Sequence, residues 1–344
     1  MVMRTRINTA MLAALPLLVA GCSDFEVRSI VLDLRVLAMA ADPPEIVVPF
    51  DADDLPDNPA DVDVEDVEVC ALVADPAHSR ALEFTMRACS TTDTRRCDEP
   101  DRPVVTMGEG TITDPEQSAP PAPGAEDPDT RIACSMLRAD LSLYNLLQDA
   151  VDNDSLSGFG GVEVMIEFTA YPPGETSAGA VWAAKRMLYA PKVPAERVAN
   201  KNPSLAELRV SREDGEELVA PLGRCGDGGN DGQLTARIGE LLTFEPIETE
   251  GSREDYVVPT FDGGSRMFTE NHTYSWYATS GDWEREVTGG PRDFAGNEPP
   301  LDSEWTAPED AAEVGDGLDV RFWVVQRDER GGLTWYETCL RVMP

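Results

Sequence analysis

The chain has 344 residues and a formal net charge of −36, from 28 Lys and Arg against 64 Asp and Glu. Its only lysines are Lys185, Lys192 and Lys201. Nucleic acid and anionic lipid surfaces are therefore poor partners, because binding to phosphate needs clustered Lys and Arg. The length exceeds what one compact core usually holds, so we expect two domains.

The N-terminus has the pattern of a secretory signal. Residues 1–10 carry Arg4 and Arg6 without an acid. Residues 11–20 (MLAALPLLVA) are apolar, about half the length that an apolar helix needs to cross a bilayer. We therefore expect residues 1–21 to be a signal peptide that is removed on export.

The end of this segment, Val19-Ala20-Gly21-Cys22, resembles the lipobox of bacterial lipoproteins. The resemblance implies cleavage before Cys22 and lipid on its thiol, and several acyl chains make a stable anchor. Residues 22–29 would then be a tether, and Ser23 after the cysteine favours the outer membrane. The alternative is a soluble secreted protein whose signal happens to end near a cysteine.

The remaining cysteines form an even set: Cys70, Cys89, Cys97, Cys134, Cys225 and Cys339. None lies in a CxxC motif, and His78 and His272 are the only histidines, so zinc-ligand spacing is absent. Outside the cytoplasm such a set indicates disulfides. We expect Cys225 to pair with Cys339. Cys89 and Cys97 bracket a short loop and could pair, leaving Cys70 with Cys134, which is one of three ways to pair these four.

Residues 30–190 mostly show the alternation of strands that bury one face. In one of them Val67, Val69, Ala71 and Val73 share a face. Leu141–Val151 has apolar residues at helical spacing and is expected to cap one end of a sandwich. Acidic and Pro-rich insertions, Asp51–Asp66 and Thr113–Thr130, are expected to be surface loops. Further strands are expected at Ile30–Ala40, Ala81–Ala88, Val162–Ala170 (with Glu163 and Glu167 on its polar face) and Val181–Tyr189.

The segment 191–203 is rich in proline and lacks apolar periodicity, so we expect a linker before a second domain at 204–344. There, two alternating segments flank Gly331-Gly332 and predict a β-hairpin. Trp276 is expected to anchor the core. The expected strands are Leu205–Val210, Leu234–Phe244, Thr273–Thr279, Leu318–Gln326 and Thr334–Val342.

Together these elements predict an all-β protein of two immunoglobulin-like antiparallel sandwiches in tandem. Tyr274-Ser-Trp276 with Gly281-Asp282 resembles PKD-type immunoglobulin-like domains, as does the hairpin after Val324. Arg35-Val-Leu37 with Ala41-Asp-Pro-Pro-Glu45 resembles the opening of such a domain in uncharacterised envelope lipoproteins of myxobacteria. The resemblance implies a surface location and no catalytic residues.

The sequence offers no catalytic constellation. His78 lies in a polar turn and His272 opens a strand, and neither has a nucleophile motif nearby. Trp276, Trp323 and Trp335 could form a sugar-stacking platform, but in strands of a sandwich they are expected in the core. The best metal candidate is a calcium site at Asp227, Asn230 and Asp231, although a plain turn is the stronger interpretation because the EF-hand pattern is incomplete.

We therefore expect a membrane-anchored surface protein that binds or scaffolds other envelope components, proteins or surface polysaccharide, without catalysis and without a required cofactor. A hydrolase acting on envelope polysaccharide is the alternative, because an acidic chain supplies many carboxylate pairs. A third interpretation is a calcium-dependent adhesion module.

Overall fold

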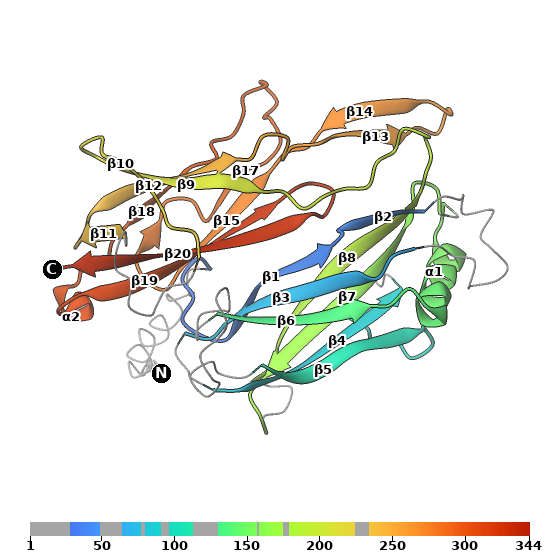
Figure 1. The fold of residues 1–344 in the computed structure, drawn as a ribbon, viewed down its shortest axis with the longest axis horizontal. Coiled ribbons are helices and arrows are strands. Elements are labelled where there is room, and N and C mark those ends of the chain that lie inside the picture. Colours follow the sequence, from blue (N-terminus) through green and yellow to red (C-terminus); the bar gives the residue numbers. More distant parts are fainter. Residues whose placement is uncertain are drawn as a thin grey trace, which may run out of the picture.

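The computed structural model describes residues 28–48, 64–76, 80–90, 96–112, 130–156, 158–174, 179–223 and 234–344. The fold is mostly β, as predicted, with strands in several sheets and short helices (Figure 1). Within these ranges, no helix is both long and apolar enough to span a membrane.

The N-terminal part of the chain forms two sheets whose inner faces share one apolar core. The smaller has the strand order β1-β3-β6 and the larger the order β2-β8-β7-β4-β5. Their elements are β1 (Arg35–Asp42), β2 (Glu45–Val48), β3 (Val67–Ala74), β4 (Leu82–Ser90), β5 (Val104–Ile112), β6 (Thr130–Leu137), α1 (Leu141–Asn153), β7 (Val162–Tyr171) and β8 (Val181–Pro191).

The spacing of apolar residues determines which face of each element packs into the core. Val67 and Val69 of β3 are buried in the shared core, as the alternation predicts. Helix α1 begins at Asp140, whose carboxylate accepts hydrogen bonds from the N–H groups of Ser142 and Leu143. Leu143, Leu146 and Leu147, at helical spacing, enter the same core at one end of the two sheets.

Two disulfides lie in this part and join the predicted pairs. Cys70 and Cys134 are directly opposite on β3 and β6, with their Cα atoms 4.1 Å apart. The second disulfide joins Cys89, near the end of β4, to Cys97. Cys339 is also disulfide-bonded, and its predicted partner Cys225 lies outside the described residues.

The C-terminal part contains two five-stranded sheets around a second core, with strand orders β10-β9-β12-β18-β16 and β11-β20-β19-β15-β17. A separate two-stranded sheet is formed by β13 and β14. The elements are β9 (Leu205–Arg212), β10 (Glu217–Val219), β11 (Leu234–Arg237), β12 (Leu241–Glu248), β13 (Asp255–Pro259), β14 (Ser265–Thr269), β15 (Thr273–Ala278), β16 (Asp282–Trp283), β17 (Val287–Gly289), β18 (Ser303–Thr306), α2 (Ala311–Val314), β19 (Leu318–Arg327) and β20 (Leu333–Met343).

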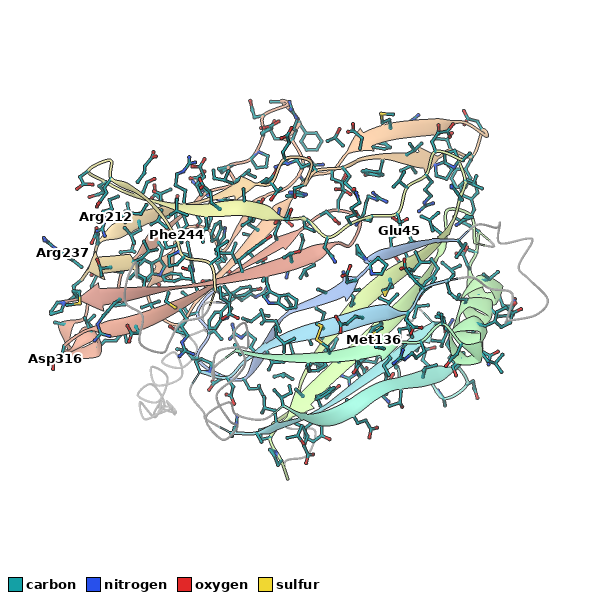
Figure 2. The ribbon with its side chains drawn as sticks, viewed as in Figure 1. Glu45, Met136, Arg212, Arg237, Phe244 and Asp316 are labelled. Carbon is teal, nitrogen blue, oxygen red and sulfur yellow. A yellow bond between two sulfur atoms is a disulfide. The ribbon has the colours of Figure 1, made fainter. Side chains whose placement is uncertain are left out.

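Aromatic side chains fill the second core. One of them is Phe244, labelled in Figure 2. Its ring centroid lies 5.1 Å from that of Phe322 and 5.2 Å from that of Trp283. Trp276 is fully buried, as predicted, and its indole N–H donates to the Thr288 hydroxyl (2.9 Å). The segment predicted as one strand over Leu234–Phe244 is instead two strands, because the chain turns at Gly239, where φ is +69°.

A third apolar cluster joins the two parts of the molecule. Leu37 and Leu72 on the outer face of the small sheet pack against Trp323 and Val325 of β19. The backbone also links them, since Val31 N–H donates to the carbonyl of Ala278 (2.8 Å). The segment predicted as a linker packs between the two parts, with Asn200 buried and the Asn202 amide donating to the Ala41 carbonyl (2.8 Å).

Candidate functional site

The most distinctive surface feature is a cleft of about 660 Å³ where the two parts of the chain meet. Its floor is the outer face of β7 and β8, and one wall is the turn between β19 and β20. The β13–β14 hairpin lies above β2 and β8 and forms the other wall (Figure 1). We call this the hairpin cleft.

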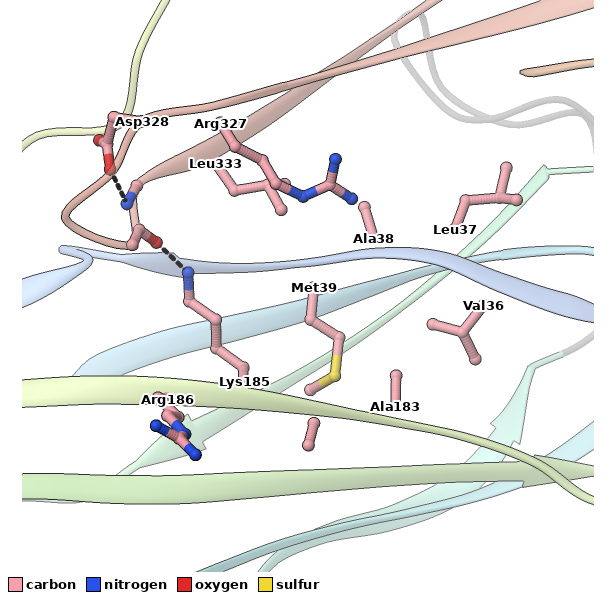
Figure 3. A pocket seen from close by; sticks show the side chains of 13 residues that line it. Val36, Leu37, Ala38, Met39, Ala183, Lys185, Arg186, Arg327, Asp328 and Leu333 are labelled. Atoms are coloured by element: carbon pink, nitrogen blue, oxygen red, sulfur yellow. Dashed lines mark hydrogen bonds between the residues drawn. The ribbon is translucent and has the colours of Figure 1, made fainter. Parts of the chain in front are cut away.

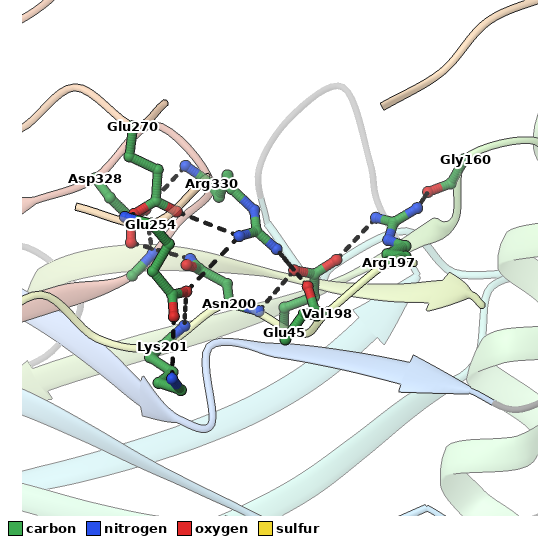
Figure 4. Close-up of polar contacts among 11 residues, drawn as sticks. Glu45, Gly160, Arg197, Val198, Asn200, Lys201, Glu254, Glu270, Asp328 and Arg330 are labelled. Atoms are coloured by element: carbon green, nitrogen blue, oxygen red, sulfur yellow. Dashed lines mark hydrogen bonds and ion pairs between the residues drawn. The ribbon is translucent and has the colours of Figure 1, made fainter. Parts of the chain in front are cut away.

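A buried ion-pair network supports the cleft from below. Glu45, only 1% exposed, accepts hydrogen bonds from Arg197 (2.8 Å), from Arg330, and from the backbone N–H of Asn200 (2.9 Å) (Figure 4). Glu45 follows the first strand of the N-terminal part, whereas Arg330 lies in the final turn of the C-terminal part. We call Glu45, Arg197, Asn200 and Arg330 the polar clamp, because they tie these distant segments together.

Arg330 also organises the wall of the cleft. Its guanidinium carbon lies 4.9 Å from the centroid of the Tyr256 ring, and it pairs with the buried carboxylate of Glu270 (3.3 Å). The Tyr256 hydroxyl donates to Glu329 (2.7 Å). Burial, followed by this hydrogen bond to a carboxylate, raises the pKa of Tyr256 to about 12. Tyr256 is therefore a neutral hydrogen-bonding group at physiological pH.

The turn that carries Arg330 is fixed by Asp328. Its carboxylate accepts hydrogen bonds from the N–H groups of Arg330 (2.8 Å) and Gly332 (2.7 Å), and from the amide of Asn200 (3.0 Å). Lys185 on β8 donates to the carbonyl of Gly331 across a smaller pocket of about 340 Å³ (Figure 3). Burial lowers the pKa of Lys185 to about 8, despite the opposing effect of Asp328.

The rim of the cleft is apolar and exposed. Phe261 at the tip of the β13–β14 hairpin is 80% exposed and stacks on Phe159, which is 41% exposed, with ring centroids 4.9 Å apart. Leu156, Val198 and Val258 nearby are 51%, 65% and 38% exposed. A second hollow of about 720 Å³ continues past Phe159 toward the end of α1. Gathered apolar side chains of this kind typically mark an interaction site.

The polar groups of the cleft are satisfied within the protein. Glu163 pairs with Arg186 (3.2 Å), and Glu45 pairs with Arg197 inside the polar clamp. Glu329 accepts hydrogen bonds from the Tyr256 hydroxyl and from the amide of Asn271 (2.9 Å). Among the described residues that line it there is no Ser, Cys or His. The arrangement suits packing and hydrogen bonding to a ligand, and it offers no nucleophile beside a base.

Several predicted site residues lie outside the described residues: Cys22, His78, Cys225 and the calcium candidates Asp227, Asn230 and Asp231. Predictions about them therefore stay predictions. Of the carboxylate and cysteine groups that are described, Glu68, Cys70 and Cys134 lie close enough together to hold a metal ion. The two sulfurs form a disulfide, so they are not thiolate ligands.

His272 directly precedes β15, at the strand end where it was expected, and it is buried. Its Nδ1 lies 3.0 Å from Glu248 and 3.1 Å from the amide of Gln326. Burial alone would raise the pKa of Glu248, but hydrogen bonds from His272, Arg253 and Tyr274 outweigh it and lower the pKa. The group forms a hydrogen-bonded network inside the C-terminal part.

The sugar-platform hypothesis for the tryptophans is wrong for the two that are buried. Trp276 and Trp323 are fully buried, and Trp335 is partly buried against the third apolar cluster. The predicted polar face of β7 is also partly wrong, since Glu167 is 1% exposed. The loop at Cys97 covers it and donates a backbone hydrogen bond to its carboxylate (3.1 Å), while Arg96 pairs with the same group (3.0 Å).

Comparisons with known proteins add little. The sequence matches no protein-family model and no curated protein. Among solved structures, a transglutaminase from red sea bream has 9% identity and a TM-score of 0.23, over 91% of this chain and 32% of that one. This chain thus spans about a third of the transglutaminase.

Two other structures show similarly distant likeness. A bacterial adhesin from Mobiluncus mulieris, with intramolecular disulfide, isopeptide and ester bond cross-links, has 8% identity and a TM-score of 0.25, over 91% of this chain and 99% of that one. Dimeric latent PorU from Porphyromonas gingivalis has 10% identity and a TM-score of 0.19, over 90% and 24%. At these TM-scores the likeness carries no information about function.

Proposed function

We propose that this protein is a lipid-anchored surface protein of the bacterial envelope that acts by binding another envelope component, not by catalysis. The signal-like segment and the lipobox-like Cys22 support the anchor and an outer-membrane location. The resemblance of residues 35–45 to uncharacterised myxobacterial envelope lipoproteins supports the same assignment.

The observation that carries the binding role is the hairpin cleft. It combines an exposed aromatic pair, Phe159 and Phe261, with a floor whose charges already have partners. An exposed aromatic pair is unfavourable in water unless a ligand covers it, and a rigid hydrogen-bonded support keeps the contact surface in place. We infer that an envelope protein or surface polysaccharide occupies the cleft.

The anchor is tested by cell fractionation and intact mass of the native protein beside a Cys22→Ser variant. We expect the native protein to carry diacylglycerol and to fractionate with membranes, and the variant to be soluble. If both forms are soluble and unlipidated, the anchor hypothesis is wrong and a freely secreted protein takes its place.

The cleft is tested with the soluble Cys22→Ser protein and a washed envelope fraction from the same cells. We expect the protein to sediment with the envelope, and Phe261→Ala to weaken this retention at least about tenfold, because a few large, mostly aromatic side chains carry most of the energy of a binding interface. Phe294→Ala is the matched control, since Phe294 is fully exposed on another loop. Equal retention of the two variants would contradict the proposal. Protease or periodate treatment of the envelope then distinguishes protein from polysaccharide.

A further inference from the structure

Strand β14 is an exposed edge strand. It pairs with β13 alone among the described strands, and all five of its residues, Ser265–Thr269, are exposed. A two-stranded sheet is marginally stable by itself in water. Phe268 and Met267 are 43% and 72% exposed on this strand, so further pairing would cover apolar surface.

The hydrogen-bond pattern shows which groups face outward. Glu270 N–H donates to the Glu254 carbonyl (3.0 Å), and Thr260 N–H donates to the Gly264 carbonyl (2.9 Å). Because bonded pairs alternate in an antiparallel ladder, Arg266 and Phe268 also bond to β13. Ser265, Met267 and Thr269 therefore direct their backbone N–H and C=O groups away from the hairpin. Pro259, which has no N–H, lies opposite Ser265. This agrees with the alternation, because that pair is not hydrogen-bonded.

The edge has few of the features that usually prevent strand addition, because only Arg266 of β14 is charged. Natural edge strands are short, bulged, charged or interrupted by proline. Here β10 and β16 have three and two residues, and β5 carries a bulge in its pairing with β4. Strand β14 (SRMFT) has no acid, no proline and no glycine.

We propose that β14 is a self-association strand, which pairs antiparallel with β14 of a second copy to form a four-stranded sheet. With a two-fold axis at Met267, this residue exchanges both backbone hydrogen bonds with Met267 of the second copy. Ser265 exchanges both of its backbone hydrogen bonds with Thr269 of the second copy. Arg266 then lies opposite Phe268 of the second copy, where a cation can sit over an aromatic ring. The strand is thus complementary to itself.

Charge favours this strand over other surfaces for contact between copies. Each chain has a net charge of −36, so two copies repel one another over most of their surface. Arg266 is the only charged residue of β14. A contact through one short strand is small, so we expect a weak dimer whose affinity rises with salt as the repulsion between chains is screened.

Sedimentation velocity of the purified Cys22→Ser protein over a concentration series tests the proposal. We expect a monomer–dimer equilibrium that shifts toward dimer between low and physiological salt. Met267→Pro removes the outward N–H at the two-fold axis but no hydrogen bond to β13, so it should weaken dimerisation at least about tenfold. Met267→Leu keeps that N–H and is the matched control. A protein that stays monomeric throughout, or a dimer that Met267→Pro does not weaken, would overturn the proposal.

Register is tested by oxidation of a Met267→Cys variant in the same background. Residues that exchange both hydrogen bonds across an antiparallel pair have Cα atoms about 5.5 Å apart, which suits a disulfide. We expect a cross-linked dimer from Met267→Cys but not from Phe294→Cys, which lies on the exposed loop between β17 and β18. Absence of the Met267→Cys cross-link, or equal cross-linking of both variants, also overturns it.

Discussion

Replacing Glu45 by glutamine tests whether the polar clamp holds the molecule together. Glu45 is 1% exposed and accepts from two arginines that are themselves only 10% and 12% exposed. Glutamine keeps the size of the side chain but removes its charge, so Arg197 loses its carboxylate partner. Removing one partner of a buried ion pair typically costs roughly 3–5 kcal/mol.

The lower end of that range applies here, because Arg330 keeps its contact with Glu270 (3.3 Å) after the substitution. We therefore expect Glu45→Gln to lower the free energy of unfolding by about 3 kcal/mol. The measurement is urea unfolding followed by tryptophan fluorescence with the disulfides intact. The control is Asp66→Asn, whose pair with Arg138 (2.7 Å) is exposed to solvent, so its loss should change the free energy of unfolding much less than Glu45→Gln does. If both variants lose the same small amount, the clamp does not support the cleft.

Further predictions concern other buried groups. The pKa of Lys185 is about 8 in the folded protein and higher when unfolded, so the unfolded state binds more protons between these values. Stability should therefore rise by about 2 kcal/mol from pH 8 to 10 in urea titrations, and this rise should disappear in Lys185→Met. The pKa of Glu248 is lowered, so its stabilisation is present above the unfolded value of 4.5 and is lost as pH falls below it. Glu248→Gln should flatten that acid limb, and an unchanged limb would contradict the network. Replacing Cys70 and Cys134 together by alanine should cost about 4 kcal/mol, against roughly 2–3 kcal/mol for Cys89 and Cys97, because the loops span 64 and 8 residues. Thermal unfolding of the two variants checks the order.

The elements that were predictable from the sequence are those that bury one face. Val67, Val69, Ala71 and Val73 alternate because β3 lies over a core, and the leucines of α1 recur at helical spacing for the same reason. The long final hairpin was predictable too, because Gly331 adopts φ +99° in its turn. An element that buries one face has apolar residues at regular spacing in the sequence. That spacing identifies only elements of this kind.

Strands without such a face were missed. β13 and β14 form a hairpin whose residues are exposed or only partly buried, so no alternation marks them. The predicted polar face of β7 failed at Glu167 because a covering loop, and not the strand, determines its burial. Predicting that loop would have required knowing how the Cys89–Cys97 disulfide places it.

The candidate site could not be predicted from local patterns at all. Arg330 and Glu45 are 285 residues apart in sequence. An ion pair between residues so far apart produces no recognisable pattern in the sequence around either of them. Phe159 and Phe261 come from loops of different parts of the chain and meet only in the folded molecule. The segment 191–203 was predicted as a linker from its prolines, yet it supplies Arg197 and Asn200 to the clamp.

The most direct test of the central claim is photo-crosslinking in living cells that make the full chain. A photoreactive phenylalanine analogue replaces Phe261 at the rim of the hairpin cleft in one strain and Phe294, on the exposed loop between β17 and β18, in another. If the cleft is the binding surface, position 261 forms a discrete cross-linked product with an envelope component and position 294 does not. Products of the same pattern and yield from both positions, or none from position 261, would contradict the account.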